Sequence, residues 1–288
     1  MNFRGTYTAL ATPFLGNGID TEAFRAHIER QIAAGVEGIV PVGTTGESPT
    51  VTHEEHREII RVAVEAANKR CLVIAGTGSN STAEAVDLTY EAERCGADAA
   101  LLVTPYYNKP SQEGLFRHFC AVANSTDMPI ILYSIPGRCV IELAVETVAR
   151  LAAECPNIVA IKEAGGKVER VTALRAALPP TFDILSGDDA LTLPFIREGA
   201  VGVVSVASNL MPAEVSTMVR LALDNRMDEA QAINERLDAL FRDLFIEPNP
   251  VPVKYAMSLR GWCKADVRLP LCEMSEANRE RLRATLGL

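Results

Sequence analysis

The chain has 288 residues, of which 48% are hydrophobic and 23% are charged, so it carries enough apolar surface to bury a substantial core. Acidic residues outnumber basic ones by 37 to 28, which gives a net charge of −9, and no basic stripe occurs. We therefore exclude nucleic acid and anionic membrane surfaces as expected partners. The sequence contains no run of about 18 uncharged apolar residues, so we expect no membrane-spanning helix.

The N-terminal stretch MNFRGTYTALATPF contains too short an apolar segment for a secretion signal. The seven cysteines are scattered along the chain, odd in number and never spaced as CxxC. Such a pattern is typical of free thiols in a reducing compartment. We therefore expect a cytoplasmic protein.

Eight apolar runs recur in chain order, most of them beginning roughly 30 residues after the one before, which is the length of a strand–loop–helix unit. The seventh unit is shorter. We predict strands over residues 6–10, 38–42, 72–75, 99–103, 130–133, 158–161, 183–185 and 202–206.

Amphipathic stretches separate these runs. Thr52 with Glu55 forms the pattern of a capping box at one predicted helix start, and Ser81 with Glu84 repeats it. Apolar strands alternating with helices predict a parallel sheet covered on both faces. Eight units favour a closed (β/α)8 TIM barrel over residues 1–225, with an open doubly wound sheet as the alternative.

The eighth barrel helix is expected to begin at Met211. The remaining residues, 226–288, are predicted to form a small C-terminal helical appendage. The proline-rich segment EPNPVPVK, residues 247–254, marks a break within it.

The unusual residues follow the predicted strands, at the carboxyl ends where such barrels carry their active sites. The segments are GTTGES, GTGSN, TPYYNKP, YSIPGR, KEAGG and SGDD. Glycine-rich polar loops are expected in any barrel. They do not explain two adjacent tyrosines, Tyr106 and Tyr107, together with a tyrosine and a lysine that each end a strand, Tyr133 and Lys162.

Lys162 ends the apolar run NIVAIK and, by strand alternation, shares a face with Ala160 and Ile158, whereas Glu163 points toward the helices. A lysine at a strand end can also simply extend to solvent. If Lys162 points inward, no carboxylate is evident beside it, so burial lowers its pKa and yields a nucleophilic amine. Tyr133, on the next strand, is then a candidate general acid and base.

Three other patterns suggest different chemistry. Gly76-Thr77-Gly78 resembles the start of a dinucleotide-binding loop, but Ser81 stands where the third glycine belongs. His53 and His56 share a helix face that could suit a metal, but they lack a partner ligand, so a solvated face is favoured. Asp188-Asp189 could hold magnesium, but a turn and helix-capping role is favoured.

Seven motifs, spread in order over essentially the whole chain, resemble the dihydrodipicolinate synthase family, within the class I pyruvate aldolases that include N-acetylneuraminate lyase. They are GTTGES (43–48), AGTGSN (75–80), VTPYYNKPSQEGL (103–115), ILYSIPGR (131–138), IKEAGG (161–166), LSGDD (185–189) and FIEPNPVPVK (245–254). The resemblance implies that pyruvate condenses with L-aspartate 4-semialdehyde, without metal or organic cofactor, on the route to diaminopimelate and lysine.

The same resemblance implies roles for individual residues. Lys162 corresponds to the Schiff-base lysine and Tyr133 to the proton-transfer tyrosine, which Thr44 links to Tyr107 from the neighbouring subunit. The substrate-binding positions are Thr44 and Thr45 for the pyruvate carboxylate, Arg138 for the semialdehyde carboxylate, and Gly187 and Val204 in the pyruvate pocket.

A second set of residues resembles the family's site for lysine as feedback inhibitor: Ser48, His53, His56, Asn80, Glu84 and Tyr106. A capping role is the structural alternative for Glu84. The family further implies a homotetramer built from two tight dimers. Ser134, where asparagine is common, and Pro49 depart from the pattern. Two alternatives stay open: a sister aldolase acting on a sugar acid, and a non-catalytic barrel that binds a small carboxylate.

Overall fold

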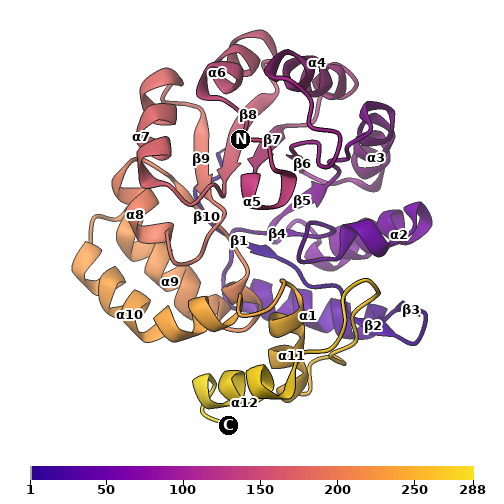
Figure 1. Ribbon diagram of the computed structural model, residues 1–288, viewed down its shortest axis with the longest axis vertical. Helices are drawn as coiled ribbons and strands as arrows, with labels where there is room; N and C mark the ends of the chain where they lie inside the picture. The colour runs from indigo at the N-terminus through magenta and orange to yellow at the C-terminus, as the bar shows by residue number, and fades with distance from the viewer. Residues whose placement is uncertain (1) are drawn as a thin grey trace.

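A closed barrel of eight parallel strands forms the centre of the molecule in this computed structural model, which describes residues 2–288 (Figure 1). The order around the barrel is β1-β10-β9-β8-β7-β6-β5-β4. The strands are β1 (Gly5–Ala9), β4 (Gly38–Val40), β5 (Leu72–Gly76), β6 (Ala99–Val103), β7 (Ile130–Ser134), β8 (Ile158–Glu163), β9 (Asp183–Ser186) and β10 (Gly202–Ser205). The predicted (β/α)8 barrel is confirmed, and the open-sheet alternative is wrong because β1 pairs with both β4 and β10.

Helices surround the barrel in chain order (Figure 1). The short helix α5 (Pro136–Cys139) lies inside this ring of helices in Figure 1, and there are two 3-10 turns, η1 (Ser48–Thr50) and η2 (Ala207–Asn209). The surrounding helices are α1 (Thr21–Ala33), α2 (His53–Ala67), α3 (Thr82–Cys95), α4 (Gln112–Ala123), α6 (Val145–Glu154), α7 (Val168–Ala177), α8 (Thr192–Arg197) and α9 (Pro212–Leu223). Their apolar faces pack on the outward residues of the strands, which leaves the inward residues as a separate core.

The two predicted capping boxes differ. At α2, the Thr52 side chain accepts from the Glu55 backbone, and the Glu55 carboxylate accepts from the Thr52 N–H, so the box is complete. At α3, Ser81 Oγ accepts from the Glu84 N–H, but the Glu84 carboxylate does not return to Ser81. The second prediction is therefore half right, and the Glu84 carboxylate contacts the Ser79 hydroxyl and the His53 imidazole instead.

A β-bulge interrupts the pairing of β7 with β8. Ile130 pairs with Ile158, but Ile131 pairs with Ala160, so Val159 is the extra residue. As a result, Ile158 packs outside with the helices, while Ala160 packs inside the barrel. The predicted common face of Lys162 and Ala160 is confirmed, but the inclusion of Ile158 is wrong, because simple alternation does not hold across a bulge.

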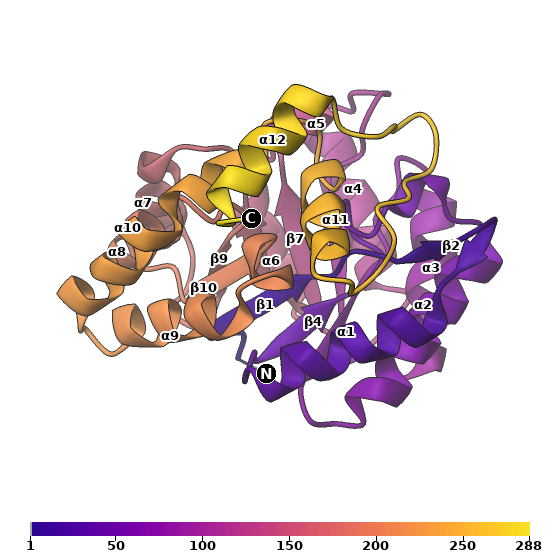
Figure 2. The ribbon, with the colours of Figure 1, turned by 90° about the horizontal axis from the view of Figure 1, so that it is seen from below.

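The C-terminal helices are α10 (Met227–Asp243), α11 (Val251–Leu259) and α12 (Glu276–Thr285). They lie against one side of the barrel and extend toward the end where α5 is found (Figure 2). A single apolar cluster joins them to α9 and β10, so the core continues across the predicted boundary at residue 225. A two-stranded hairpin, β2 (Phe14–Leu15) with β3 (Gly18–Ile19), was not predicted. Among residues 2–288, no helix is both long enough and apolar enough to cross a membrane.

Candidate active site

Lys162 lies at the carboxyl end of β8 and points into the barrel. Only 7% of the residue is exposed, and its strand neighbours in register are Tyr133 on β7 and Leu185 on β9. The ammonium nitrogen lies 4.1 Å from the centroid of the Tyr133 ring. The sequence-based expectation that these two side chains meet at the barrel mouth agrees with this placement.

Burial lowers the pKa of Lys162 to about 7, although the negative charge of Asp189 opposes this effect and Arg138 adds to it. The expectation of no carboxylate nearby was therefore incomplete, because Asp189 enters from the loop after β9. Its carboxylate accepts hydrogen bonds from the Ser205 hydroxyl and from the Val206 and Ala207 N–H groups. Asp189 thus caps the turn η2 and does not bond to the lysine.

Glu163 points away from Lys162, as the strand alternation predicts. Its buried carboxylate pairs with Arg170 on α7 at 2.7 Å and accepts the Gly165 N–H at 2.6 Å. This arrangement anchors the end of β8 from the helix side, and the Lys162 amine has no bonded carboxylate in the part of the chain that the structure describes.

Tyr133 is 5% exposed, and burial raises the pKa of its phenol, an effect that Arg138 and a hydrogen bond with Thr44 oppose. The phenol therefore stays protonated at neutral pH and can donate a proton. Thr44 lies in the turn after β4 and lines the same cavity as Tyr133, so the two residues that were predicted to be linked lie together within one chain.

Gly187 follows β9 and lies directly beside the lysine. A Cβ atom built there would lie 2.7 Å from Ala164 Cβ, closer than real Cβ contacts allow, and 3.0 Å from Lys162 Cε, which is a tight contact. The position therefore requires glycine so that the Lys162 side chain can lie where it does.

A small cavity opens at the barrel mouth above Lys162. It brings together Thr44, Thr45, Tyr133, Arg138, Lys162 and Gly187 from the predicted set, and Phe245 and Asn249 from the C-terminal region. The Asn249 amide donates to Thr45 Oγ1 at 2.9 Å, and the Asn249 carbonyl accepts from Arg138 at 3.3 Å. Sequence reasoning missed these two residues, although the motif that contains them was recognised.

Two predicted residues lie outside this cavity. Val204 is buried in the barrel interior, and Val206 takes its place in the cavity lining. Tyr107 is 88% exposed, with a left-handed φ of 72°. Its side chain does not line the active site of its own chain.

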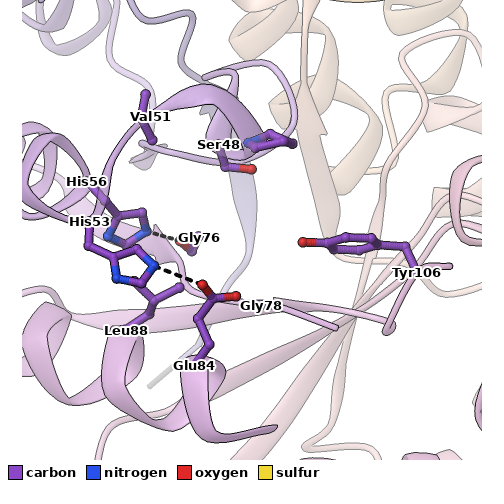
Figure 3. A pocket seen from close by; sticks show the side chains of 10 residues that line it. Ser48, Val51, His53, His56, Gly76, Gly78, Glu84, Leu88 and Tyr106 are labelled. Atoms are coloured by element: carbon purple, nitrogen blue, oxygen red, sulfur yellow. Dashed lines mark hydrogen bonds and ion pairs between the residues drawn. The ribbon is translucent and has the colours of Figure 1, made fainter. Parts of the chain in front are cut away.

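A second cavity, of about 210 Å³, lies between the turn after β4 and the start of α3 (Figure 3). Its lining includes Ser48, His53, His56, Glu84 and Tyr106. His53 Nε2 lies 2.8 Å from the Glu84 carboxylate, and His56 Nε2 lies 2.8 Å from the Gly76 carbonyl. The Tyr106 hydroxyl points into the cavity from the side opposite the histidines (Figure 3).

Most of the predicted inhibitor-site residues are thus brought together, but Asn80 is absent from this lining. The Asn80 carbonyl accepts instead from the Asn108 amide at 2.8 Å. Burial lowers the pKa of His56, so this imidazole is neutral at physiological pH. Within residues 2–288, no three His, Cys, Asp or Glu side chains are arranged to hold a metal ion.

The dihydrodipicolinate synthetase family model matches residues 2–287. A 4-hydroxy-tetrahydrodipicolinate synthase of Citrifermentans bemidjiense is 51% identical over 284 residues, which cover 99% of this chain and 98% of that one. The structure of the synthase from Methylacidiphilum fumariolicum is 57% identical, with a TM-score of 0.99 over 99% of this chain and 95% of that chain. A DHDPS from Cyanidioschyzon merolae, with lysine bound, is 43% identical, with a TM-score of 0.96 over 99% and 98% of the two chains.

The chain belongs to the dihydrodipicolinate synthetase family. The predicted enzyme class and reaction, condensation of pyruvate with L-aspartate 4-semialdehyde in lysine and diaminopimelate biosynthesis, are confirmed by this membership. The sugar-acid aldolase and the non-catalytic barrel are not favoured.

Proposed function

We propose that Lys162 is the amine that carries pyruvate through this condensation. The supporting observation is that its side chain is buried, bonded to no carboxylate among residues 2–288 and held at a pKa of about 7, so a large neutral fraction exists at physiological pH. The amine attacks the pyruvate carbonyl carbon, water leaves, and a cationic imine forms. The imine withdraws electrons from the methyl group, which loses a proton and becomes an enamine.

The enamine carbon then attacks the aldehyde carbon of L-aspartate 4-semialdehyde, and Tyr133 passes the protons that the step needs. The amino group of the condensed chain closes the ring and displaces Lys162. Thr44 and Thr45 hold the pyruvate carboxylate, and Arg138, whose guanidinium can bind a carboxylate through two hydrogen bonds, receives the semialdehyde. Gly187 leaves room for the lysine.

Borohydride reduction in the presence of pyruvate tests this assignment. The reductant converts the imine to a stable secondary amine, which peptide mapping should locate at Lys162. A stable adduct at another lysine would overturn the assignment, and semialdehyde turnover measured in parallel would show whether the overall reaction still holds.

We propose that free lysine inhibits the enzyme by binding the second cavity. Glu84 offers a carboxylate for the ligand's ammonium group, and Ser48, His53 and Tyr106 offer polar atoms around it. Pro49, the departure from the family pattern, also lines this cavity. Calorimetry with lysine, paired with the steady-state rate, is the test: binding with inhibition is expected, and the absence of binding would remove the proposal.

We further propose a cytoplasmic homotetramer built from two tight dimers, in which Tyr107 completes the active site of the neighbouring subunit. The exposed aromatic side chain of Tyr107 supports this arrangement, and the seven free cysteines support a reducing compartment. Sedimentation velocity measures the assembly, and full activity of Tyr107→Phe would argue against a proton relay through this residue.

A further inference from the structure

The turn after β4 carries a buried carboxylate that the reaction does not use. Glu47 is 2% exposed and adopts the left-handed conformation, with φ 57° and ψ 38°. Residues with a Cβ adopt this conformation at a cost, so the surrounding structure must hold it in place.

One cation and one backbone N–H from the C-terminal region hold this carboxylate. Lys254 Nζ on α11 donates to Glu47 Oε1 at 2.6 Å, and the Arg268 backbone N–H donates to Glu47 Oε2 at 2.9 Å. Both side chains also pack over the ring of Phe14, at 4.1 Å for Lys254 and 4.3 Å for Arg268. We refer to Glu47, Lys254 and Arg268 as the Glu47 cluster.

Arg268 also contacts the segment that follows Glu47. Its guanidinium donates to the Thr50 carbonyl at 2.9 Å and pairs with the Glu55 carboxylate through both of its terminal nitrogens. Glu55 completes the capping box of α2, the helix that carries His53 and His56. The C-terminal region therefore bonds to residues 47–55 at three positions, Glu47, Thr50 and Glu55.

The backbone connects these contacts to both cavities. The Glu47 N–H donates to the Thr44 carbonyl at 3.1 Å, and the Thr50 N–H donates to the Glu47 carbonyl at 3.0 Å. Thr44 and Thr45 line the active site on one side of Glu47, and Ser48 lines the second cavity on the other. Residues 43–48 thus form one tight turn shared by the two cavities.

We propose that Glu47 is a positioning residue: its cluster holds the turn as one rigid unit, fixes Thr44 and Thr45 for pyruvate, and transmits ligand binding at Ser48 to the active site. The second part rests on the proposed inhibition by lysine. A ligand that draws Ser48 toward itself can move the threonines only if the turn does not deform between them. The C-terminal region therefore helps to set the geometry of the catalytic centre.

If the Glu47 cluster had a purely structural role, its variants would behave differently. In that case, weakening the cluster would lower the melting temperature but leave the kinetics of the folded fraction unchanged. The test therefore measures, below the unfolding transition, the KM for pyruvate, kcat, the lysine concentration for half inhibition, and the dissociation constant of lysine by calorimetry.

Two variants weaken the cluster to different degrees. Glu47→Gln keeps the shape but removes the charge, and Arg268→Met keeps an apolar stem over Phe14 while losing the bonds to Thr50 and Glu55. Arg268 has a partly exposed side chain, so its variant should fold even if Glu47→Gln does not. We expect the KM for pyruvate to rise by roughly tenfold with little change in kcat, because the threonines contribute to binding.

We expect the lysine concentration for half inhibition to rise by about tenfold, within the usual range of coupling between sites, while the dissociation constant of lysine changes less than about threefold. Asp243→Asn is the matched control: Asp243 is a buried carboxylate of the same region, bonded to Arg281 and Thr285, and contacts neither residues 43–48 nor residues 49–55. This variant should keep all four quantities.

The outcomes distinguish the positioning role of Glu47 from the coupling between the two cavities. If the wild-type chain does not bind lysine, the proposed inhibition fails, and the KM for pyruvate alone still decides the positioning role. An unchanged KM and an unchanged half-inhibition value in folded Glu47→Gln or Arg268→Met would overturn the inference. Equal weakening of lysine binding and inhibition would overturn the coupling, because it would show damage to the second cavity only.

Discussion

Two lysines of this chain are buried in similar surroundings but differ in one contact. Lys162 lies at the barrel mouth and Lys254 lies where α11 meets the turn after β4, and each ammonium nitrogen is 4.1 Å from the centroid of an aromatic ring. Lys254 bonds to the Glu47 carboxylate at 2.6 Å, whereas the amine of Lys162 bonds to no carboxylate in the described chain. The same residue type is thereby suited to structure in one place and to chemistry in the other.

Burial lowers the pKa of both amines, but a bonded carboxylate counteracts the effect only at Lys254. Asp189 acts on Lys162 from a distance, and its oxygens are already occupied by Ser205 and two backbone N–H groups. An uncompensated buried amine is costly for the fold and useful for imine formation. A buried lysine is therefore suited to imine formation only if it also lacks a bonded carboxylate.

The difference between the two lysines can be tested by replacing each with Met, which has a similar length and no charge. Lys162→Met should lower kcat by more than about 10⁴-fold, because the oriented nucleophile is lost. It should also stabilise the fold by about 4 kcal/mol at pH 7. The reason is that burial lowers the pKa of Lys162 from 10.5 to about 7, which means that the charged amine costs more free energy in the folded chain than in the unfolded chain.

Lys254→Met should do the opposite to stability, lowering it by about 3–5 kcal/mol, because the buried Glu47 carboxylate loses its cation. Urea unfolding of both variants and of the wild-type chain measures the difference. If both substitutions changed stability in the same direction, the contrast between the two lysines would not hold.

Tyr133→Phe keeps the aromatic ring over Lys162 and removes the phenolic hydroxyl group. The ring still packs over Lys162, so the amine keeps its surroundings and the imine still forms. We expect kcat for the condensation to fall by about 10²–10⁴-fold, the usual contribution of a general acid or base. Single-turnover kinetics with borohydride trapping separates the two steps, and unchanged turnover would assign proton transfer to another group.

The pH dependence tests the unpaired state of Lys162 directly. With a pKa of about 7, about half of the amine is neutral at pH 7 and about 1% at pH 5, so trapping of the imine should slow by about 50-fold between these pH values. A plateau should appear above pH 8. A rate that climbs tenfold per unit up to pH 10 would mean that Lys162 is as basic as an exposed lysine.

The same depressed pKa has a consequence for stability. Between about pH 7 and 10.5, the unfolded chain binds the proton of Lys162 and the folded chain does not, so this group makes stability rise with pH in that window. The gain of Lys162→Met over the wild-type chain should accordingly be greatest below pH 7 and vanish above about 10.5. Urea unfolding at several pH values measures this trend.

The regular part of the fold could be predicted from the sequence because it follows from repetition. The strands fall within a residue or two of their expected places, and the alternation of side chains gave the inward direction of Lys162 and the outward direction of Glu163. The bulge at Val159 could not be predicted, because nothing in NIVAIK distinguishes an extra residue from a regular one.

Contacts between segments that are distant in the sequence could also not be predicted. The segment 247–254 was interpreted as a break between helices, yet Asn249 lines the active site together with the preceding Phe245, and Lys254 binds Glu47. One signal was available: a single lysine lies within VPVKYAMSL, an otherwise apolar helix, and such a charge needs a buried partner. The sequence could indicate that a partner exists but could not identify Glu47, which is 207 residues away.

The smallest expected effect comes from the space around the reactive lysine. In Gly187→Ala, the new methyl group would press on Lys162 Cε and Ala164 Cβ, so the amine must shift by a few tenths of an ångström. We expect imine formation to slow by roughly tenfold, since small displacements of a reacting group reduce the rate strongly. Gly18→Ala, where nothing lies within 4 Å of the added atom, is the control and should react normally. Normal trapping in Gly187→Ala would show that the barrel mouth yields to the methyl group, and the position of the amine would then owe less to Gly187 than to the strands that hold it.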